Sequence, residues 1–231
     1  MPKRGRLIVF LGPVGVGKST VIKGLANELR ARGFRVSTTF IKAFHGPSYL
    51  LWILVTRLLG LRTGWLAPWY VIPRSGRLKL VKVLTLLSAY IDAFISIPLK
   101  LVKVLMLRAL GFYVLSEDYM HSALIDYAHS YIASGLRGWV YKLPLSIINL
   151  LLSKYSPDNV VILDAGDDVL RERWRLRNYG DPQLHYVRLQ RVVLMSMISD
   201  GEVINTDGLN IIDEVKLIMA RVISDHVDSK I

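Results

Sequence analysis

The sequence feature that most constrains the fold is a glycine-rich octapeptide, Gly12-Pro13-Val14-Gly15-Val16-Gly17-Lys18-Ser19. It directly follows Leu7–Leu11, a continuous apolar run typical of a strand buried on both faces of a parallel sheet. It precedes residues 19–32, where apolar residues recur at helical spacing until Gly33 ends the helix. A G-x-x-x-x-G-K-S sequence between a strand and a helix predicts a loop whose backbone N–H groups surround phosphate oxygens.

Each part of this loop has an expected task. The glycines allow the backbone to wrap around phosphates, and the helix that follows adds its positive end. We expect Lys18 to reach the β- and γ-phosphates of ATP and to contact only those phosphates. The hydroxyl of Ser19 is expected to ligate Mg²⁺. The predicted ATP-binding residues are therefore those from Gly12 to Thr20.

Strand and helix patterns alternate along the whole chain. Strands are predicted at residues 7–11, 34–40, 112–115, 160–164 and 203–205. Helices are predicted at residues 19–32, 48–61, 78–97, 99–110, 122–134, 143–154, 168–177, 182–199 and 211–227, with Pro98 splitting two of them and residues 64–76 as a connection. This alternation predicts an α/β fold with a doubly wound parallel sheet, in one domain over residues 1–231.

Two acidic residues follow the third predicted strand. Glu117 and Asp118, with Tyr119 after them, come at its carboxyl end. In open parallel sheets ligands bind beyond the carboxyl ends of the strands, so these side chains are expected to face the phosphate loop. A carboxylate there can orient the water shell of Mg²⁺ or accept a proton, which makes Glu117 a candidate catalytic and metal-binding residue.

The predicted helix at residues 168–177 is strongly basic. Its arginines are Arg171, Arg173, Arg175 and Arg177. Clustered like charges favour contact with anions, and guanidinium groups suit phosphoryl oxygens. Because the loop has no basic residue at Pro13, Val14 or Val16, extra positive charge must come from elsewhere. We expect residues 168–182 to form a basic, mobile lid whose Arg173 and Arg177 act on ATP.

The middle of the chain, residues 48–110, is unusually apolar for a soluble protein. Its acidic content is a single residue, Asp92, among many lysines and arginines. Residues 83–99 are short for a membrane span and carry that charge, so we expect a buried or interface-forming helix. The chain has 52% hydrophobic residues, a formal charge of +12 and no cysteine. The charge favours polyanionic ligands, and the missing cysteine excludes disulfides and thiolate zinc sites.

These residues together resemble the thymidylate kinase family of nucleoside monophosphate kinases over most of the chain. The likeness includes residues 7–20, the segment from Ser116 to Ser122 set against the family's Asp-Arg-Tyr segment, Asp164 with the basic helix after it, and residues 204–208. It implies transfer of the ATP γ-phosphoryl group to dTMP, with Glu117 in place of the motif aspartate. It also implies that Arg173 and Arg177 are lid residues and that the protein is a homodimer.

Two positions depart from the family pattern. Asp118 stands where the motif has arginine, and Asp92 lies near the position of a second arginine that contacts the monophosphate. Replacing arginine by aspartate reverses the Coulomb term and removes a bidentate donor. We therefore count His45, Asp92, Asp118 and Tyr119 as candidate acceptor-binding residues, His45 because it lies in the loop after the second strand.

Three functions stay open at the sequence level. The leading hypothesis is an ATP- and Mg²⁺-dependent nucleotide kinase. A nucleoside or an apolar alcohol is the alternative acceptor, because neither needs the missing arginines. The third hypothesis is an ATP-binding switch that docks on a membrane or a protein partner through the apolar segment. We expect a cytoplasmic protein, with contact to a membrane surface as an alternative, and we do not expect a nucleic-acid partner.

Overall fold

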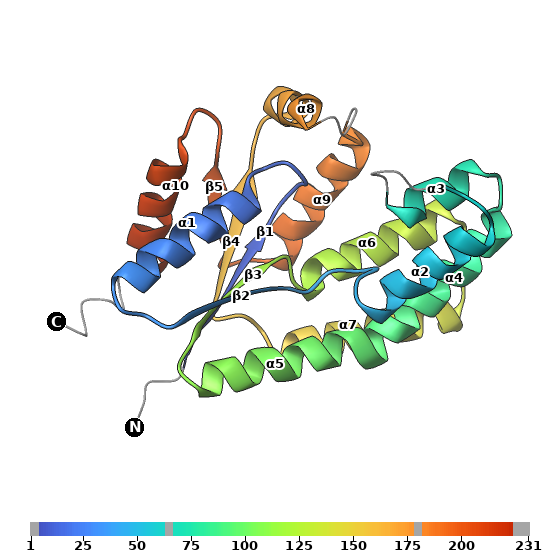
Figure 1. Cartoon of the computed structure of the whole chain (residues 1–231), viewed down its shortest axis with the longest axis horizontal. Helices are drawn as coiled ribbons and strands as arrows, with labels where there is room; N and C mark the ends of the chain where they lie inside the picture. Colours follow the sequence, from blue (N-terminus) through green and yellow to red (C-terminus); the bar gives the residue numbers. More distant parts are fainter. Residues whose placement is uncertain (1–4, 63–66, 178–181, 224–231) are drawn as a thin grey trace. The chain divides into compact units, whose positions relative to one another are not determined.

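Strand β1 (Leu7–Leu11) lies at the centre of a five-stranded parallel sheet, and all five of its residues are buried. The computed structural model describes residues 5–62, 67–177 and 182–223. The strand order is β2-β3-β1-β4-β5, with the remaining strands at Val36–Phe40, Tyr113–Glu117, Asn159–Asp164 and Glu202–Asn205. Helices surround the sheet (Figure 1). The predicted α/β class with a doubly wound parallel sheet is confirmed.

The chain forms two compact units. The first comprises Met1–Phe40, Val104–Tyr119 and Pro157–Ile231, and the second comprises Ile41–Lys103 and Met120–Ser156. The sheet belongs to the first unit, together with α1 (Lys18–Ala31), α8 (Asp167–Leu176), α9 (Leu184–Met197), α10 (Ile211–Ile218) and a π-helical turn at Met219–Ile223. The apolar face of α1 packs on the sheet through residues such as Val21, Leu25 and Leu29.

Helices make up the second unit within the described residues. They are α2 (Pro47–Leu58), α3 (Pro68–Arg74), α4 (Leu78–Ile91), the first half of α5 (Ile97–Ala109), α6 (Met120–Ala133) and α7 (Trp139–Lys154). Its core is aromatic. Trp52 is 1% exposed and donates its indole N–H to Ser88 Oγ at 2.8 Å, while Phe44 packs against Trp52 and Tyr127.

The prediction that Pro98 splits two helices is wrong. Helices α4 and α5 join through a π-helical turn, Asp92–Ser96, into one helix of 32 residues, Leu78–Ala109. Proline has no N–H to offer the carbonyl one turn earlier, and its ring crowds that carbonyl. The wider turn lies directly before Pro98 and provides room for this change without ending the helix.

One other element prediction needs correction. The connection predicted at residues 64–76 contains helix α3 (Pro68–Arg74), which Pro68 begins at its first position. Residues 63–66, and the end of the helix predicted at 211–227, lie outside the described residues. Among the described residues, the helix Leu78–Ala109 is long and apolar enough to cross a membrane by length and composition, although 44% of its most apolar stretch is buried.

A partly buried ion pair lies at the amino-terminal end of β1 and β4. Asp158, just before β4, accepts the Leu7 backbone N–H at 2.6 Å through Oδ2, and Arg108 Nη2 donates to its Oδ1 at 2.7 Å. The Arg108 side chain is 9% exposed. Asp158 therefore joins β1 to the end of α5.

We predict that Asp158→Ala lowers the free energy of unfolding by about 2–4 kcal/mol, because it leaves the Arg108 guanidinium buried without its counter-charge. Urea unfolding followed by circular dichroism measures the change. Asp168→Ala is the matched control, since the side chain of Asp168 is 96% exposed and its pairing with Arg171 is long. Equal losses in the two variants would contradict this role of Asp158.

Candidate nucleotide-binding site

The glycine-rich loop leaves β1 in a conformation that needs its glycines. Gly12, Gly15 and Gly17 have φ values of 132°, 94° and 110°, where side chains are disfavoured. A Cβ atom at Gly12 would also overlap the carbonyl oxygen of Leu163 on β4. Helix α1 begins at Lys18 without a side-chain cap, so the loop ends at the positive end of a helix dipole. This arrangement suits an anionic ligand.

Lys18 contacts the loop itself. Its ammonium group donates to the carbonyl oxygens of Gly12 at 2.6 Å and Pro13 at 3.1 Å, and the residue is 5% exposed. The expectation that Lys18 contacts only ligand phosphates is therefore wrong. Lys18 holds the curvature of the loop in addition to any contact that it makes with phosphate.

Ser19 and Glu117 meet beside the loop, which the side chain of Glu117 was expected to face. Strand register pairs Phe10 with Glu117, so β1 and β3 end at the same level. The Ser19 hydroxyl donates to Glu117 Oε2 at 2.7 Å. Both side chains offer oxygen, the ligand type that Mg²⁺ prefers, and Mg²⁺ needs few protein ligands because it retains several waters. This pair fits the predicted Mg²⁺ site.

Asp118 and Tyr119 follow Glu117 into the interior. Asp118 has a φ of 59° and is 1% exposed, and Ser116 Oγ donates to its backbone carbonyl at 2.7 Å. Its Oδ1 lies 3.9 Å from Lys18 Nζ. The acid at the family's arginine position therefore lies close to the loop lysine. Tyr119 is fully buried, and burial raises the pKa of its phenol.

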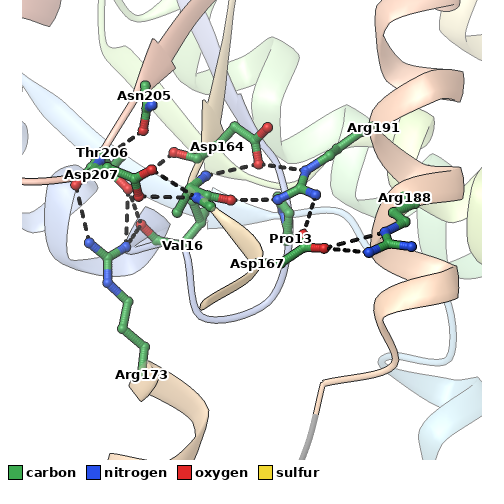
Figure 2. A network of polar contacts seen from close by, with 12 residues as sticks. Pro13, Val16, Asp164, Asp167, Arg173, Arg188, Arg191, Asn205, Thr206 and Asp207 are labelled. Carbon is green, nitrogen blue, oxygen red and sulfur yellow. Dashed lines mark hydrogen bonds and ion pairs between the residues drawn. The ribbon is translucent and has the colours of Figure 1, made fainter. Parts of the chain in front are cut away.

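Helix α8 brings Arg173 and Trp174 to the loop. Arg173 Nη1 donates to the Val16 carbonyl at 2.9 Å and to Thr206 Oγ1 at 3.0 Å, and Nη2 donates to the Thr206 carbonyl at 3.2 Å (Figure 2). Trp174 Nε1 donates to the Val14 carbonyl at 2.7 Å. Its ring leaves no space for a side chain at Gly15. Trp174 and Thr206 were not among the predicted site residues.

A second group of contacts orders the turn between β4 and α8. Arg191 on α9 donates to Asp164 Oδ1 at 2.9 Å, to Asp167 Oδ1 at 2.6 Å and to the Ala165 carbonyl (Figure 2). Arg188 adds a bond of 2.9 Å to Asp167. Hydrogen bonds from Arg191 and Arg188 hold the pKa of Asp167 below its usual value. Because these contacts depend on how α9 packs, the local sequence carried no signal for them.

A cavity of about 300 Å³ opens beside the loop. Its walls come from the loop, the start of α1, the end of α8 and the first turns of α10; the lining residues are Gly15, Val16, Gly17, Thr20, Arg173, Leu176, Arg177, Ile211 and Glu214. Burial raises the pKa of Glu214, and the nearby Arg173 opposes that shift. A mostly apolar cavity with a few charged groups, next to a phosphate-binding loop, suits the base and ribose of a nucleotide.

The structure places the predicted lid residues on this cavity. Arg177 lies at the end of α8 and lines the cavity beside Arg173. Residues 178–181 of the predicted lid at 168–182 lie outside the described residues. Arg173 donates to the carbonyls of Val16 in the loop and of Thr206 just after β5. These contacts attach helix α8 to the phosphate loop.

His45 and Asp92 belong to the second unit. Asp92 is fully buried and accepts three hydrogen bonds, from the Phe44 N–H at 2.8 Å, Ser48 Oγ at 2.7 Å and Tyr127 OH at 2.6 Å. Burial raises the pKa of its carboxyl group against these hydrogen bonds. Asp92 thereby holds Phe44 in a backbone conformation with a φ of 59°. His45 Nδ1 lies 2.6 Å from the Ala43 carbonyl, and burial lowers the pKa of its ring.

Comparison with known proteins identifies the fold. No family model matches the chain, and no curated protein sequence matches it. Among solved structures the chain is similar to thymidylate kinase from Candida albicans, with 14% sequence identity and a TM-score of 0.57. The match covers 97% of this chain and 93% of that one. The chain therefore has the fold of a thymidylate kinase.

We predict that Arg173→Ala weakens binding of a non-hydrolysable ATP analogue about tenfold or more. The substitution removes a charge from the cavity and three hydrogen bonds that position Val16 and Thr206. Hydrogen bonds from charged donors contribute roughly 1.5–3 kcal/mol each. Isothermal titration calorimetry gives the affinity. Arg175→Ala, an exposed arginine on the same helix, should leave the affinity unchanged. Equal affinities for the two variants would refute this role of Arg173.

Proposed function

We propose that this protein is an ATP-dependent phosphotransferase of the nucleotide kinase kind, which transfers the γ-phosphoryl group of ATP to a nucleotide acceptor. The observation that carries the proposal is the contact of Ser19 with Glu117 beside the glycine-rich loop. A binding loop alone needs the glycines and Lys18. A carboxylate on the neighbouring strand adds a group that can position the metal or the acceptor for phosphoryl transfer.

Each residue of the candidate site has its own role in the proposed phosphoryl transfer. Backbone N–H groups of the glycine-rich loop after Pro13, which itself has none, bind the phosphates, and Lys18 neutralises charge on them. Ser19 and Glu117 are the residues that would hold Mg²⁺, which supplies charge neutralisation across the phosphates when bound. Arg173 and Arg177 border the adjacent cavity, where the nucleoside part of ATP would lie. In the transfer, the bond between the γ-phosphorus and the bridging oxygen of ADP breaks while a bond to an acceptor oxygen forms.

The acceptor has two candidate classes. The fold likeness to a thymidylate kinase supports a nucleoside monophosphate such as dTMP. Asp118, which stands where the family pattern has arginine, supports an acceptor without a phosphate, a nucleoside or an apolar alcohol, because an acid beside Lys18 offers no donor to a phosphate and repels its charge. The two classes differ in product and are separable by experiment.

An acceptor screen tests the proposal. The purified protein is incubated with ATP and Mg²⁺ and, separately, with nucleoside monophosphates, nucleosides and apolar alcohols, and the products are identified by mass. A nucleoside diphosphate would support the leading proposal, and a phosphorylated nucleoside or alcohol the second. ATP binding without any phosphorylated product would overturn both and favour an ATP-binding switch.

We predict that Lys18→Ala lowers the rate of phosphoryl transfer by at least about a hundredfold, a loss of roughly 3 kcal/mol in transition-state stabilisation. The same change removes two hydrogen bonds inside the loop, so ATP affinity should fall as well. Lys23→Ala, an exposed lysine on the same helix, serves as control. Thermal melts of both variants check the fold, and full activity of a folded Lys18→Ala protein would show that the assigned site is wrong.

We predict that Glu117→Gln lowers the rate much more than it lowers ATP affinity. The amide retains a hydrogen bond to Ser19 but loses the charge that attracts Mg²⁺ or a proton, and that charge matters most in the transition state. Rates measured across a Mg²⁺ titration should show both a lower maximum and a shift to higher Mg²⁺. Glu28→Gln, an exposed glutamate on α1, is the control, and an unchanged Mg²⁺ profile for Glu117→Gln would remove Glu117 from the site.

A further inference from the structure

The charge of the protein is concentrated in one unit. The second unit, Ile41–Lys103 and Met120–Ser156, contains twelve lysines and arginines and two acids, Asp92 and Asp126, which gives a formal charge of +10. The total of +12 therefore leaves +2 for the unit that contains the phosphate loop. Asp92 is fully buried, so it does not offset the basic residues at the surface. The second unit thus presents a strongly positive surface.

The same unit exposes large apolar side chains in a row. Along the part of the long helix that it contains, the exposed positions are Val83, Leu87, Phe94, Ile95, Leu99 and Val102, with exposed fractions between 46% and 63%. Apart from the adjacent pair Phe94 and Ile95 in the π-helical turn, they are spaced by three, four or seven residues, which places them on one side of the helix. The opposite side is buried through residues such as Leu84, Ala93 and Leu101. A helix of a soluble protein normally carries polar residues on the side that faces water.

Two further features extend this surface. Helix α2, which packs against α4, exposes Leu50, Leu54 and Leu58 at intervals of four residues. Exposed lysines flank the apolar row on the long helix, with Lys79 before Val83 and Lys103 after Val102. Large apolar side chains with basic residues at their margins are typical of proteins that bind the surface of an anionic membrane.

The contacts on the buried side of the helix Leu78–Ala109 exclude an arrangement in which this helix spans a membrane while the fold stays intact. Asp92 lies near the middle of the helix Leu78–Ala109 and accepts hydrogen bonds from Ser48, Phe44 and Tyr127. Crossing a bilayer would remove the helix from these partners and leave the carboxyl group in hydrocarbon. The exposed side, in contrast, is available without any change in the packing of the unit.

We propose that the second unit docks on an anionic lipid bilayer surface through the apolar row Val83–Val102 and the lysines that flank it. A second copy of this chain would bring another unit of +10 against the first, which opposes association through this face. Nucleic acid would match the charge and leave the exposed leucines and phenylalanine facing water. An anionic bilayer matches both, since its headgroups attract lysine and its acyl region accepts apolar side chains. This inference does not rest on the proposed function, because lipid binding requires neither ATP nor an acceptor.

Vesicle sedimentation tests the proposal with the full chain. The protein is mixed with vesicles of phosphatidylcholine alone, or of phosphatidylcholine with phosphatidylserine, and the bound fraction is measured at low and high salt. We expect binding to the anionic vesicles, little binding to the neutral ones, and weaker binding at high salt. Phe94→Gln with Leu99→Gln should reduce binding at least fivefold, and so should Lys79→Gln with Lys103→Gln.

Matched variants in the first unit control for general loss of hydrophobicity and charge. Val192→Gln with Met195→Gln changes two exposed apolar residues of α9, and Lys23→Gln with Lys216→Gln removes two exposed charges. Both should bind vesicles as the parent does, and thermal melts verify that every variant is folded. The proposal is overturned if the parent ignores anionic vesicles or if the control pairs lose as much binding. It is also overturned if light scattering shows a dimer that Phe94→Gln with Leu99→Gln dissociates, or if RNA binds through the same lysines while vesicles do not.

Discussion

The close approach of Gly12 to the carbonyl of Leu163 is the constraint on which the candidate site depends. It holds the end of β1 against the end of β4, so the loop leaves the sheet between two neighbouring strands. On the other side of β1, strand β3 ends with Glu117 at the level of Phe10. A side chain at Gly12 would overlap the Leu163 carbonyl and push the loop away from β4. The position of the loop beside Glu117 therefore depends in part on a backbone contact in which neither Ser19 nor Glu117 takes part.

The sequence predicted well the features that follow from a parallel sheet: the buried central strand and the grouping of residues at the carboxyl ends of the strands. Leu7–Leu11 is continuously apolar because both faces of the central strand are buried, and this made the strand and its loop recognisable. The meeting of Ser19 with Glu117 was predictable because the carboxyl ends of parallel strands share one edge of the sheet. Neither inference needed the packing of a distant helix. Both rested on periodicity and on chain direction.

The features that the sequence did not predict depend on distant packing or on geometry inside a helix. Arg191 reaches Asp164 and Asp167 only through the way in which α9 lies against the sheet. Trp174 contacts Val14 across 160 positions of the chain, and a tryptophan on a basic helix has no pattern that indicates a loop contact. Pro98 predicts a helix end, but the π-helical turn before it accommodates the missing hydrogen bond and the helix continues. Asp92 lies in that turn, where three hydrogen bonds compensate its burial.

The distribution of charge changes what the total of +12 means. From the sequence, that charge could be attributed to attraction of nucleotides. The unit with the phosphate loop is nearly neutral overall, and several of its arginines are paired locally, as Arg188 and Arg191 are with Asp167. The proposed binding of phosphates there would rely on groups at short range: the loop N–H groups, Lys18 and Arg173. The long-range field belongs to the second unit, which is also the unit with the exposed apolar helix. The two anion-binding tasks that we propose account for this division more directly than a single nucleotide site does, since a nucleotide needs no apolar surface on a helix outside the phosphate loop.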